Sequence, residues 1–221
     1  MKVVILVLST DNKIYNSLEQ TIRETWANYI PDNVEIFYYY GGAEKFNVVG
    51  DRIFCKTKES FENIGYKTLD SFEYIYDNFE FDYIFRTNSS SYVNIDKMLK
   101  FLEDKNREKF YCARVNTEVK SGIIFGSGSG YFLSKDVVKL VLEISDKWNH
   151  NLIDDVALGK LLLESDIKIF PSKRFDINNL NSIDVSRFID HFHFRCKSLD
   201  HERIEDSDII NFLHKHFNSL N

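Results

Sequence analysis

Short apolar runs alternate with longer amphipathic segments through the first hundred residues, and this alternation constrains the fold most. Apolar runs bounded by turn residues predict strands, and apolar residues at helical spacing predict helices. The predicted strands are Lys2–Leu8, Val34–Tyr40, Asp51–Cys55 and Phe81–Arg86, and the predicted helices are Asn16–Tyr29 and Ile64–Phe79. Such alternation is typical of a mainly parallel sheet covered by helices. The sequence therefore predicts an α/β fold with a mostly parallel central sheet.

Beyond residue 105 the predicted elements become shorter and more varied. We expect strands at Lys109–Val115, Tyr131–Leu133 and Ile167–Phe170, helices at Lys135–Ile144, Asn151–Leu163 and Asp206–Leu213, a glycine-serine loop at Gly122–Gly130 and irregular chain at Asp176–Asp184. Ser134 is expected to cap the helix that follows it. No repeat or low-complexity linker divides the 221 residues, so they predict one domain over residues 1–221.

Charge and cysteine content exclude several classes of protein. The net charge of -6 argues against a nucleic-acid partner. The three cysteines lack any Cys-x-x-Cys pair, which argues against a zinc knuckle or a disulfide framework and favours the cytoplasm. The apolar run at residues 3–8 is far shorter than the ~20 residues that span a bilayer. No cleavage site follows it, so we expect a buried strand and no transmembrane segment.

The predicted strand Phe81–Arg86 ends in the polar sequence Arg86-Thr87-Asn88-Ser89-Ser90. Ligands of α/β proteins bind at the carboxyl ends of the strands. This segment offers hydroxyl groups, an amide and a guanidinium, but no carboxylate. It is either a ligand site or an ordinary loop with a helix cap.

Three further polar groups are candidates for a site. The glycines of Gly126–Gly130 allow close approach to a ligand, or else make a tight turn or a bulge. Asp154 and Asp155 begin a predicted helix, where capping and the helix dipole alone explain acids. The alternating side chains of His191, His193, Arg195 and Lys197 share one face of an extended segment. Such a face could bind an anion such as a diphosphate. Alternatively, the segment is a solvated edge strand whose charges prevent pairing with another chain.

Five motifs in order carry a resemblance to a known family. They are Ile22-Arg23-Glu24-Thr25-Trp26, Asn63-Ile64-Gly65-Tyr66-Lys67-Thr68, Phe85–Asn94, Gly126–Ser134 and Asp154-Asp155-Val156 with Gly159. In this order, over residues 3–165, the chain resembles GT-A-fold glycosyltransferases of the β-1,3-galactosyltransferase and Fringe type, glycosyltransferase family 31. The animal enzymes' membrane anchor, stem and disulfide cysteines have no counterpart here, which suggests a small cytoplasmic relative of bacterial or viral type.

The resemblance implies an enzyme that transfers a sugar from a nucleotide-diphosphate-sugar, in our expectation a UDP-sugar, to a hydroxyl of a glycan acceptor. It implies an inverting reaction, with residues 1–105 as the nucleotide-sugar-binding half and residues 106–221 as the acceptor and catalytic half. By motif position Asp155 is the expected base, and Asp154 is the second choice. A retaining transferase on the same fold and a non-catalytic nucleotide-sugar or glycan-binding module with a degenerate site are the alternatives.

The family's metal-binding Asp-x-Asp position is occupied here by Asn88, Ser89 and Ser90. Mn²⁺ and Mg²⁺ prefer several oxygen ligands, with carboxylates foremost. We therefore expect no required cofactor, with positive charge at the diphosphate supplied by His193, Arg195, Lys197 and Arg86. The alternative is a weakly held Mn²⁺ or Mg²⁺ that the diphosphate chelates with help from His193 and Asn88.

The remaining expected donor contacts follow from the fold that the resemblance implies. Nucleotide contacts are expected from residues at the ends of the first two strands and from two helix residues: Ser9, Thr10, Tyr40, Gly41, Arg23 and Lys67. Gly128 and Ser129 are expected to form the floor beneath the donor sugar and the acceptor, because larger side chains would block them.

Overall fold

The computed structural model describes residues 1–199 and 202–219, which form two sheets and the helices around them. The strands of the larger, central sheet are β1 (Val3–Leu8), β2 (Val34–Tyr40), β3 (Asn47–Val49), β4 (Arg52–Phe54), β5 (Tyr83–Asn88), β7 (Tyr111–Thr117), β8 (Ile124–Ser134) and β9 (Ile169–Pro171). The smaller sheet contains β6 (Ser91–Val93), β10 (Phe175–Ile177) and β11 (His193–Cys196). The helices are α1 (Lys13–Glu24), α2 (Ile64–Asn78), α3 (Ile95–Leu102), α4 (Lys135–Glu143), α5 (Asp154–Glu164) and α6 (Glu205–Asn218).

The central sheet has the strand order β3-β4-β2-β1-β5-β8-β7-β9. Strands β4, β2, β1 and β5 run parallel to one another, while β8 is antiparallel to both β5 and β7. The small sheet has the order β10-β11-β6, and its strand β6 directly follows β5 in the chain. The predicted α/β fold with a mostly parallel central sheet and flanking helices is confirmed.

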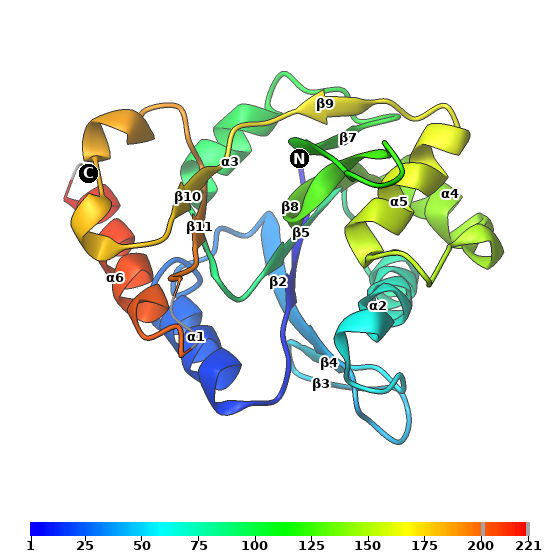
Figure 1. Ribbon diagram of the computed structural model, residues 1–221, viewed down its shortest axis with the longest axis horizontal. Helices are drawn as coiled ribbons and strands as arrows, with labels where there is room; N and C mark the ends of the chain where they lie inside the picture. The colour runs from blue at the N-terminus through cyan, green and yellow to red at the C-terminus, as the bar shows by residue number, and fades with distance from the viewer. Residues whose placement is uncertain (200–201, 220–221) are drawn as a thin grey trace.

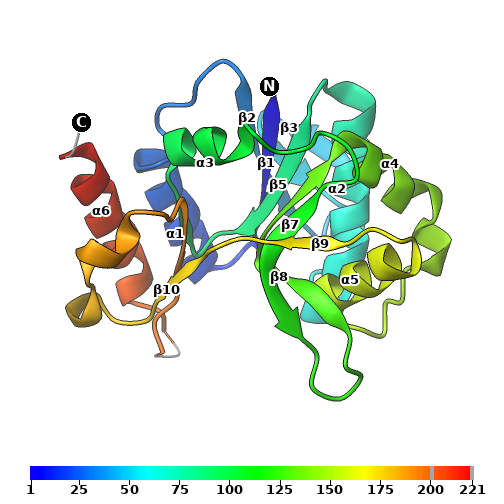
Figure 2. The ribbon, with the colours of Figure 1, turned by 90° about the horizontal axis from the view of Figure 1, so that it is seen from above.

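Two hydrophobic cores cover the two faces of the central sheet. Along β1, Val3, Ile5 and Val7 belong to one core, while Val4 and Leu6 belong to the other, because successive side chains of a strand point to opposite faces. Figures 1 and 2 show α2, α4 and α5 on one side of the sheet and α1, α3 and α6 on the other. No helix within residues 1–199 and 202–219 is long and apolar enough to cross a membrane.

The first helix begins and ends earlier than the periodicity predicts. It spans Lys13–Glu24, because the side chain of Asn12 accepts a hydrogen bond from the backbone N–H of Tyr15 and caps the helix. The predicted strand Asp51–Cys55 is confirmed as β4, but its hairpin partner β3 has no counterpart in the prediction. Strand β10 lies at the start of the stretch expected to be irregular. Ser134 occupies the N-cap position of α4, but its hydroxyl bonds to Asp136 and to the backbone of Phe110.

The predicted glycine-serine loop Gly122–Gly130 is wrong, because β8 is a continuous strand from Ile124 to Ser134. Its glycines are required by packing. A Cβ on Gly126 would lie 2.6 Å from the Cβ of Ala113, and one on Gly130 would lie 2.1 Å from Cε1 of His193. The β8 glycines therefore let neighbouring elements lie close against the sheet.

Candidate active site

The carboxyl ends of β1 and β5 lie side by side, since Leu8 is paired with Asn88 in the parallel register. A cavity of about 410 Å³ opens there, which we name the central pocket. Its lining residues are Leu8, Ser9, Thr10, Tyr15, Glu59, Ser60, Phe61, Ile64, Lys67, Asn88, Ser90, Arg195, Lys197 and Arg203. Seven expected donor contacts, which the sequence spreads over almost 190 residues, thus line one cavity: Ser9, Thr10, Lys67, Asn88, Ser90, Arg195 and Lys197.

Positive charge predominates in the lining of the central pocket. Lys67 is almost completely buried, and its Nζ donates to Oε1 of Glu59 at 2.6 Å and to the carbonyl of Ser9 at 3.0 Å. The other carboxylate oxygen of Glu59 accepts the backbone N–H of Gly41 at 2.7 Å. Among the described lining residues Glu59 is the one carboxylate, and it is already used by Lys67. The remaining cations therefore have no acidic partner among the lining residues that the structure describes.

Arg195 is the least compensated of these cations. Burial, followed by the charge of Arg174, lowers the pKa of its guanidinium. Its Nε is buried without a hydrogen-bond partner in the described part of the chain. Asp176, the residue paired with Arg195 across β10 and β11, binds Arg174 at 2.6 Å and Arg114 at 2.5 Å instead. An anion in the central pocket would supply the missing partner.

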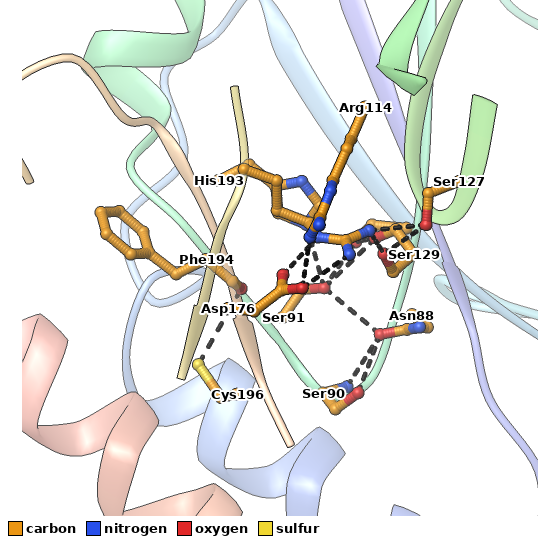
Figure 3. A network of polar contacts seen from close by, with 12 residues as sticks. Asn88, Ser90, Ser91, Arg114, Ser127, Ser129, Asp176, His193, Phe194 and Cys196 are labelled. Atoms are coloured by element: carbon orange, nitrogen blue, oxygen red, sulfur yellow. Dashed lines mark hydrogen bonds and ion pairs between the residues drawn. The ribbon is translucent and has the colours of Figure 1, made fainter. Parts of the chain in front are cut away.

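A neutral hydrogen-bonded turn stands where the family's acids would stand. Oδ1 of Asn88 accepts the backbone N–H of Ser90 at 3.2 Å and the hydroxyls of Ser90 at 3.0 Å and Ser91 at 3.2 Å (Figure 3). The hydroxyl of Ser89 donates to the carbonyl of Leu8 at 2.9 Å. Within residues 1–199 and 202–219, no three His, Cys, Asp or Glu side chains gather into a metal-binding group. The donor set at this turn does not fit a Mn²⁺ or Mg²⁺ site.

His193 does not share the charge of Arg195. Its ring is 3% exposed and contacts the hydroxyl of Ser91 at 3.2 Å (Figure 3). Burial, followed by the charge of Arg174, lowers the pKa of His193 to about 3, so the ring is neutral at physiological pH. The four-residue cationic face is thus divided: Arg195 and Lys197 line the central pocket, whereas His191 precedes β11 and packs against Phe175.

The stability of the protein is expected to fall in acid because of His193. A histidine with a depressed folded pKa contributes stability that is fully present above its unfolded pKa of 6.5 and is lost as the pH falls towards about 3. Urea unfolding at pH 7, 5.5 and 4.5 should show a smaller acid loss for His193→Gln than for the wild type. His216→Gln, at a partly exposed histidine of α6, is the control. Equal acid losses in wild type and His193→Gln would contradict the assignment.

Arg86 and Asp154 form a buried ion pair between β5 and α5. Arg86 is 2% exposed, and its Nη2 lies 2.7 Å from Oδ2 of Asp154. Its Nε donates to the hydroxyl of Tyr39 at 2.8 Å, and its Nη1 donates to the carbonyl of Gly128. The guanidinium is therefore fully engaged within the protein. Arg86 braces the site and does not face the central pocket.

Asp155 lies beside this ion pair, and backbone N–H groups hold its carboxylate. Its Oδ2 accepts the backbone N–H of Gly128 at 2.7 Å. Burial, followed by the negative charge of Asp154, raises the pKa of Asp155. A raised pKa makes a carboxylate a better proton acceptor near neutral pH. Asp155 does not line the central pocket, but Gly128 and Arg86 connect it to β5, the strand that ends at Asn88.

The other expected contacts fall in two places. Tyr40 and Gly41 border a second cavity of about 550 Å³ at the end of β2, and Gly41 is joined to the central pocket through Glu59. Arg23 borders neither cavity: it pairs with Asp51 at 2.7 Å and with Glu19 at 2.9 Å. Its position near the end of α1 favours a structural role over the expected donor contact.

Several residues of this region were missed by sequence reasoning. Arg174 joins the two sheets, since it donates to the hydroxyls of Ser127 and Ser129 on β8 and to Asp176 on β10. The expected floor residue Ser129 is therefore hydrogen-bonded to Arg174. Further missed residues around the central pocket are Tyr15, Glu59 and Arg203. None of them lies in a recognisable motif, so only the folded chain brings them together.

The sheet has a cationic pocket at the carboxyl ends of β1 and β5 and a carboxylate pair on α5, and its fold is that of solved glycosyltransferases. Two of the structures that share this fold are the following. A glycosyltransferase involved in the glycosylation of the major capsid of PBCV-1 has a TM-score of 0.60 and 12% identity, over 96% of this chain and 100% of its own. The glycosyltransferase GlyE of Streptococcus pneumoniae TIGR4 has a TM-score of 0.53 and 12% identity, over 99% of this chain and 64% of its own.

The sequence also matches a known family. Residues 17–122 match the sequence model of the family described as Galactosyltransferase. The resemblance that the motifs indicated is thereby confirmed. The matched range includes Lys67 and the Asn88 turn but ends before Asp154 and Asp155. Specific roles for the residues after 122 are therefore proposals that rest on the geometry.

Proposed function

We propose that the protein transfers a sugar from a nucleoside diphosphate sugar, in our expectation a UDP-sugar, to a hydroxyl of a glycan acceptor, with inversion and without a metal ion. The observation that carries this proposal is Arg195, a half-buried cation whose Nε has no hydrogen-bond partner among the described residues and which lines a pocket at the carboxyl ends of β1 and β5. The free, buried state of Cys55, Cys112 and Cys196 supports a cytoplasmic location.

The two cavities suit the parts of such a donor. The diphosphate would lie in the central pocket against Arg195 and Lys197. The nucleoside would extend past Ser9 towards Tyr40 and Gly41, which border the second cavity. Their volumes, about 410 and 550 Å³, lie within the ~300–1,000 Å³ that is usual for ligand sites.

Metal independence follows from where the charges lie. The departing diphosphate develops negative charge, which preorganised cations can stabilise as the bond breaks. The Asn88 turn offers a divalent cation only neutral oxygens, and these already accept or donate hydrogen bonds. Arg195 and Lys197 offer full positive charges in the same pocket. We therefore assign the neutralisation of the diphosphate to side chains.

Asp155 takes the role of the base. Its carboxylate accepts the proton of the acceptor hydroxyl while the hydroxyl oxygen attacks the anomeric carbon of the donor sugar. The bond between that carbon and the diphosphate oxygen breaks on the opposite side, and the electron pair leaves with the diphosphate. A single displacement of this kind inverts the anomeric configuration. The hydrogen bond from Gly128 fixes Oδ2 of Asp155, and we assign the proton to the other oxygen.

The metal question is tested by turnover in excess EDTA. A thermal-shift screen of UDP-, GDP- and ADP-sugars, with and without Mn²⁺, first identifies the donor, because a ligand that binds only the folded state raises its apparent stability. With that donor, we expect turnover in EDTA within about twofold of turnover in Mn²⁺, because Arg195 and Lys197 supply the charge. Complete inhibition that added Mn²⁺ reverses would overturn the metal-free mechanism.

The same screen tests the reaction itself. An inverted anomer in the product, read by NMR, supports single displacement, whereas retention of configuration would replace it by the retaining alternative. Donor binding without release of nucleoside diphosphate, with or without acceptors, would indicate that the protein is a non-catalytic binding module. Absence of stabilisation by any nucleotide-sugar would contradict the proposed function as a whole.

A further inference from the structure

We propose that Arg203, in the segment between β11 and α6, binds the diphosphate of the donor and of the product, and that Tyr15 and Asp206 hold its guanidinium in place for this purpose. This inference rests on the proposed function. It assigns a leaving-group residue to a part of the chain that lies beyond the residues matched by the family.

The guanidinium of Arg203 is fixed from two sides. Its Nε donates to Oδ2 of Asp206 at 2.7 Å, and its Nη2 donates to the same oxygen. Its Nη1 donates to the hydroxyl of Tyr15 at 3.1 Å, and the guanidinium carbon lies 5.4 Å from the centre of the Tyr15 ring. Arg203 is thus oriented before any ligand arrives, which lowers the entropy lost on binding.

Asp206 is itself firmly anchored. It is completely buried, and its Oδ1 accepts the backbone N–H of Ser198 at 2.6 Å and the hydroxyl of Ser198 at 2.7 Å. Ser198 follows β11 by two residues. One carboxylate therefore ties the end of β11, the start of α6 and the side chain of Arg203 together. Because Arg195 and Lys197 are on or directly after β11, Arg203 is held in a defined position relative to them.

An arginine that only stabilised the fold would not need to line the cavity. Arg203 lines the central pocket together with Arg195 and Lys197, and its backbone is left-handed, with a φ of 53°. Left-handed backbone is unfavourable for a residue with a Cβ. Burial and the charges of Arg195 and Arg203 lower the pKa of Lys197, so the cations repel one another in the free protein. A bound diphosphate would remove both the repulsion and the shortage of acceptors.

The charge balance points to a diphosphate in preference to a monophosphate. Asp206 compensates the charge of Arg203, and Glu59 compensates that of Lys67, so among the described residues of the pocket the excess positive charge is that of Arg195 and Lys197. Asp206 and Tyr15 use one N–H group on each nitrogen of Arg203, so the second N–H groups of Nη1 and Nη2 are the ones that would donate to phosphate oxygens. Loss of Arg203 should therefore weaken the binding of a nucleoside diphosphate far more than the binding of the matching monophosphate.

The test compares Arg203→Gln and Arg203→Lys with the wild-type protein. The probes are whichever of UDP, GDP and ADP stabilises the wild type most, and the matching monophosphate. By calorimetry we expect Arg203→Gln to raise the Kd of the diphosphate at least tenfold and that of the monophosphate less than threefold. Arg203→Lys should fall between the two proteins, since it keeps the charge without the fork. Arg107→Gln, at an exposed arginine that pairs with Asp82, is the matched control.

Turnover separates this role from a structural one. If Arg203 binds the leaving diphosphate, kcat falls in Arg203→Gln even at saturating donor. Because this variant also leaves the buried carboxylate of Asp206 without its partner, its melting temperature falls, and kcat is measured well below that temperature. Unchanged diphosphate-to-monophosphate selectivity with unchanged kcat would overturn the inference and leave the proposed function intact. If Arg203→Gln does not fold, Arg203→Lys is the test. A diphosphate-to-monophosphate selectivity equal to that of the wild type in Arg203→Lys would also overturn the inference. Failure of the wild type to bind any nucleoside diphosphate would instead contradict the proposed function.

Discussion

Asp155→Asn is expected to lower kcat by about 10²- to 10⁴-fold while nucleoside diphosphate binding stays within about twofold, because general base catalysis contributes a factor of this size. The side-chain amide retains an oxygen that can accept the backbone N–H of Gly128, so the local structure is preserved. Single-turnover transfer and calorimetric binding of the diphosphate are the two measurements. Asp208→Asn, at an exposed aspartate on α6, is the control and should leave both unchanged.

The pH dependence of the wild-type kcat/KM tests the assignment of Asp155 as the base independently. Asp155 must be ionised to accept a proton, and burial followed by the charge of Asp154 raises its pKa above the ordinary 3.8. The wild-type kcat/KM should therefore rise with pH through a pKa higher than 3.8, and this acid limb should be absent from the residual activity of Asp155→Asn. Near-normal turnover in that variant, or an unchanged acid limb, would exclude Asp155 as the base.

Asp154→Ala is expected to destabilise the protein by about 3–5 kcal/mol, because it leaves the buried charge of Arg86 without its partner. Urea unfolding monitored by circular dichroism measures this loss. The exposed pair between Lys139 and Glu143 on α4 provides the comparison. Glu143→Ala should cost no more than ~0.5 kcal/mol, since exposed helix pairs contribute little.

A double variant distinguishes an unpaired charge from simple loss of packing. Arg86→Met combined with Asp154→Leu removes both charges, and buried ion pairs are often replaced by apolar side chains without loss of stability. The double variant should therefore be more stable than Asp154→Ala. A single-variant loss below about 1 kcal/mol, or a double variant less stable than the single one, would contradict a structural role for the pair.

The central strands could be predicted because burial on both faces leaves long apolar runs. Residues 3–8 and 83–86 contain almost only such side chains, and their parallel pairing follows from the helices between them. The extended β8 could not be predicted, because glycine normally disfavours strands. Its glycines are compatible with a strand only because the ring of His193 and the side chain of Ala113 fill the space where Cβ atoms would lie.

The candidate site likewise contains residues that could be predicted from the sequence and residues that could not. Asn88, Arg195 and Lys197 could be predicted because each lies within a motif or a regular alternation. Glu59 and Arg203 could not, since each comes from a connecting segment without a pattern. The charge of His193 was expected and is absent, because the sequence does not reveal that its ring is buried against β8.

Gly128 has a consequence for anyone who wishes to alter the enzyme by directed evolution. Its N–H binds the expected base and its carbonyl binds Arg86, so both halves of one residue's backbone are committed. A Cβ there would lie 3.0 Å from both Asp155 and Arg86. Libraries should therefore leave β8 unchanged and randomise the connecting segments around the pocket. Changes there can admit new acceptor substrates while Asp155 keeps its position.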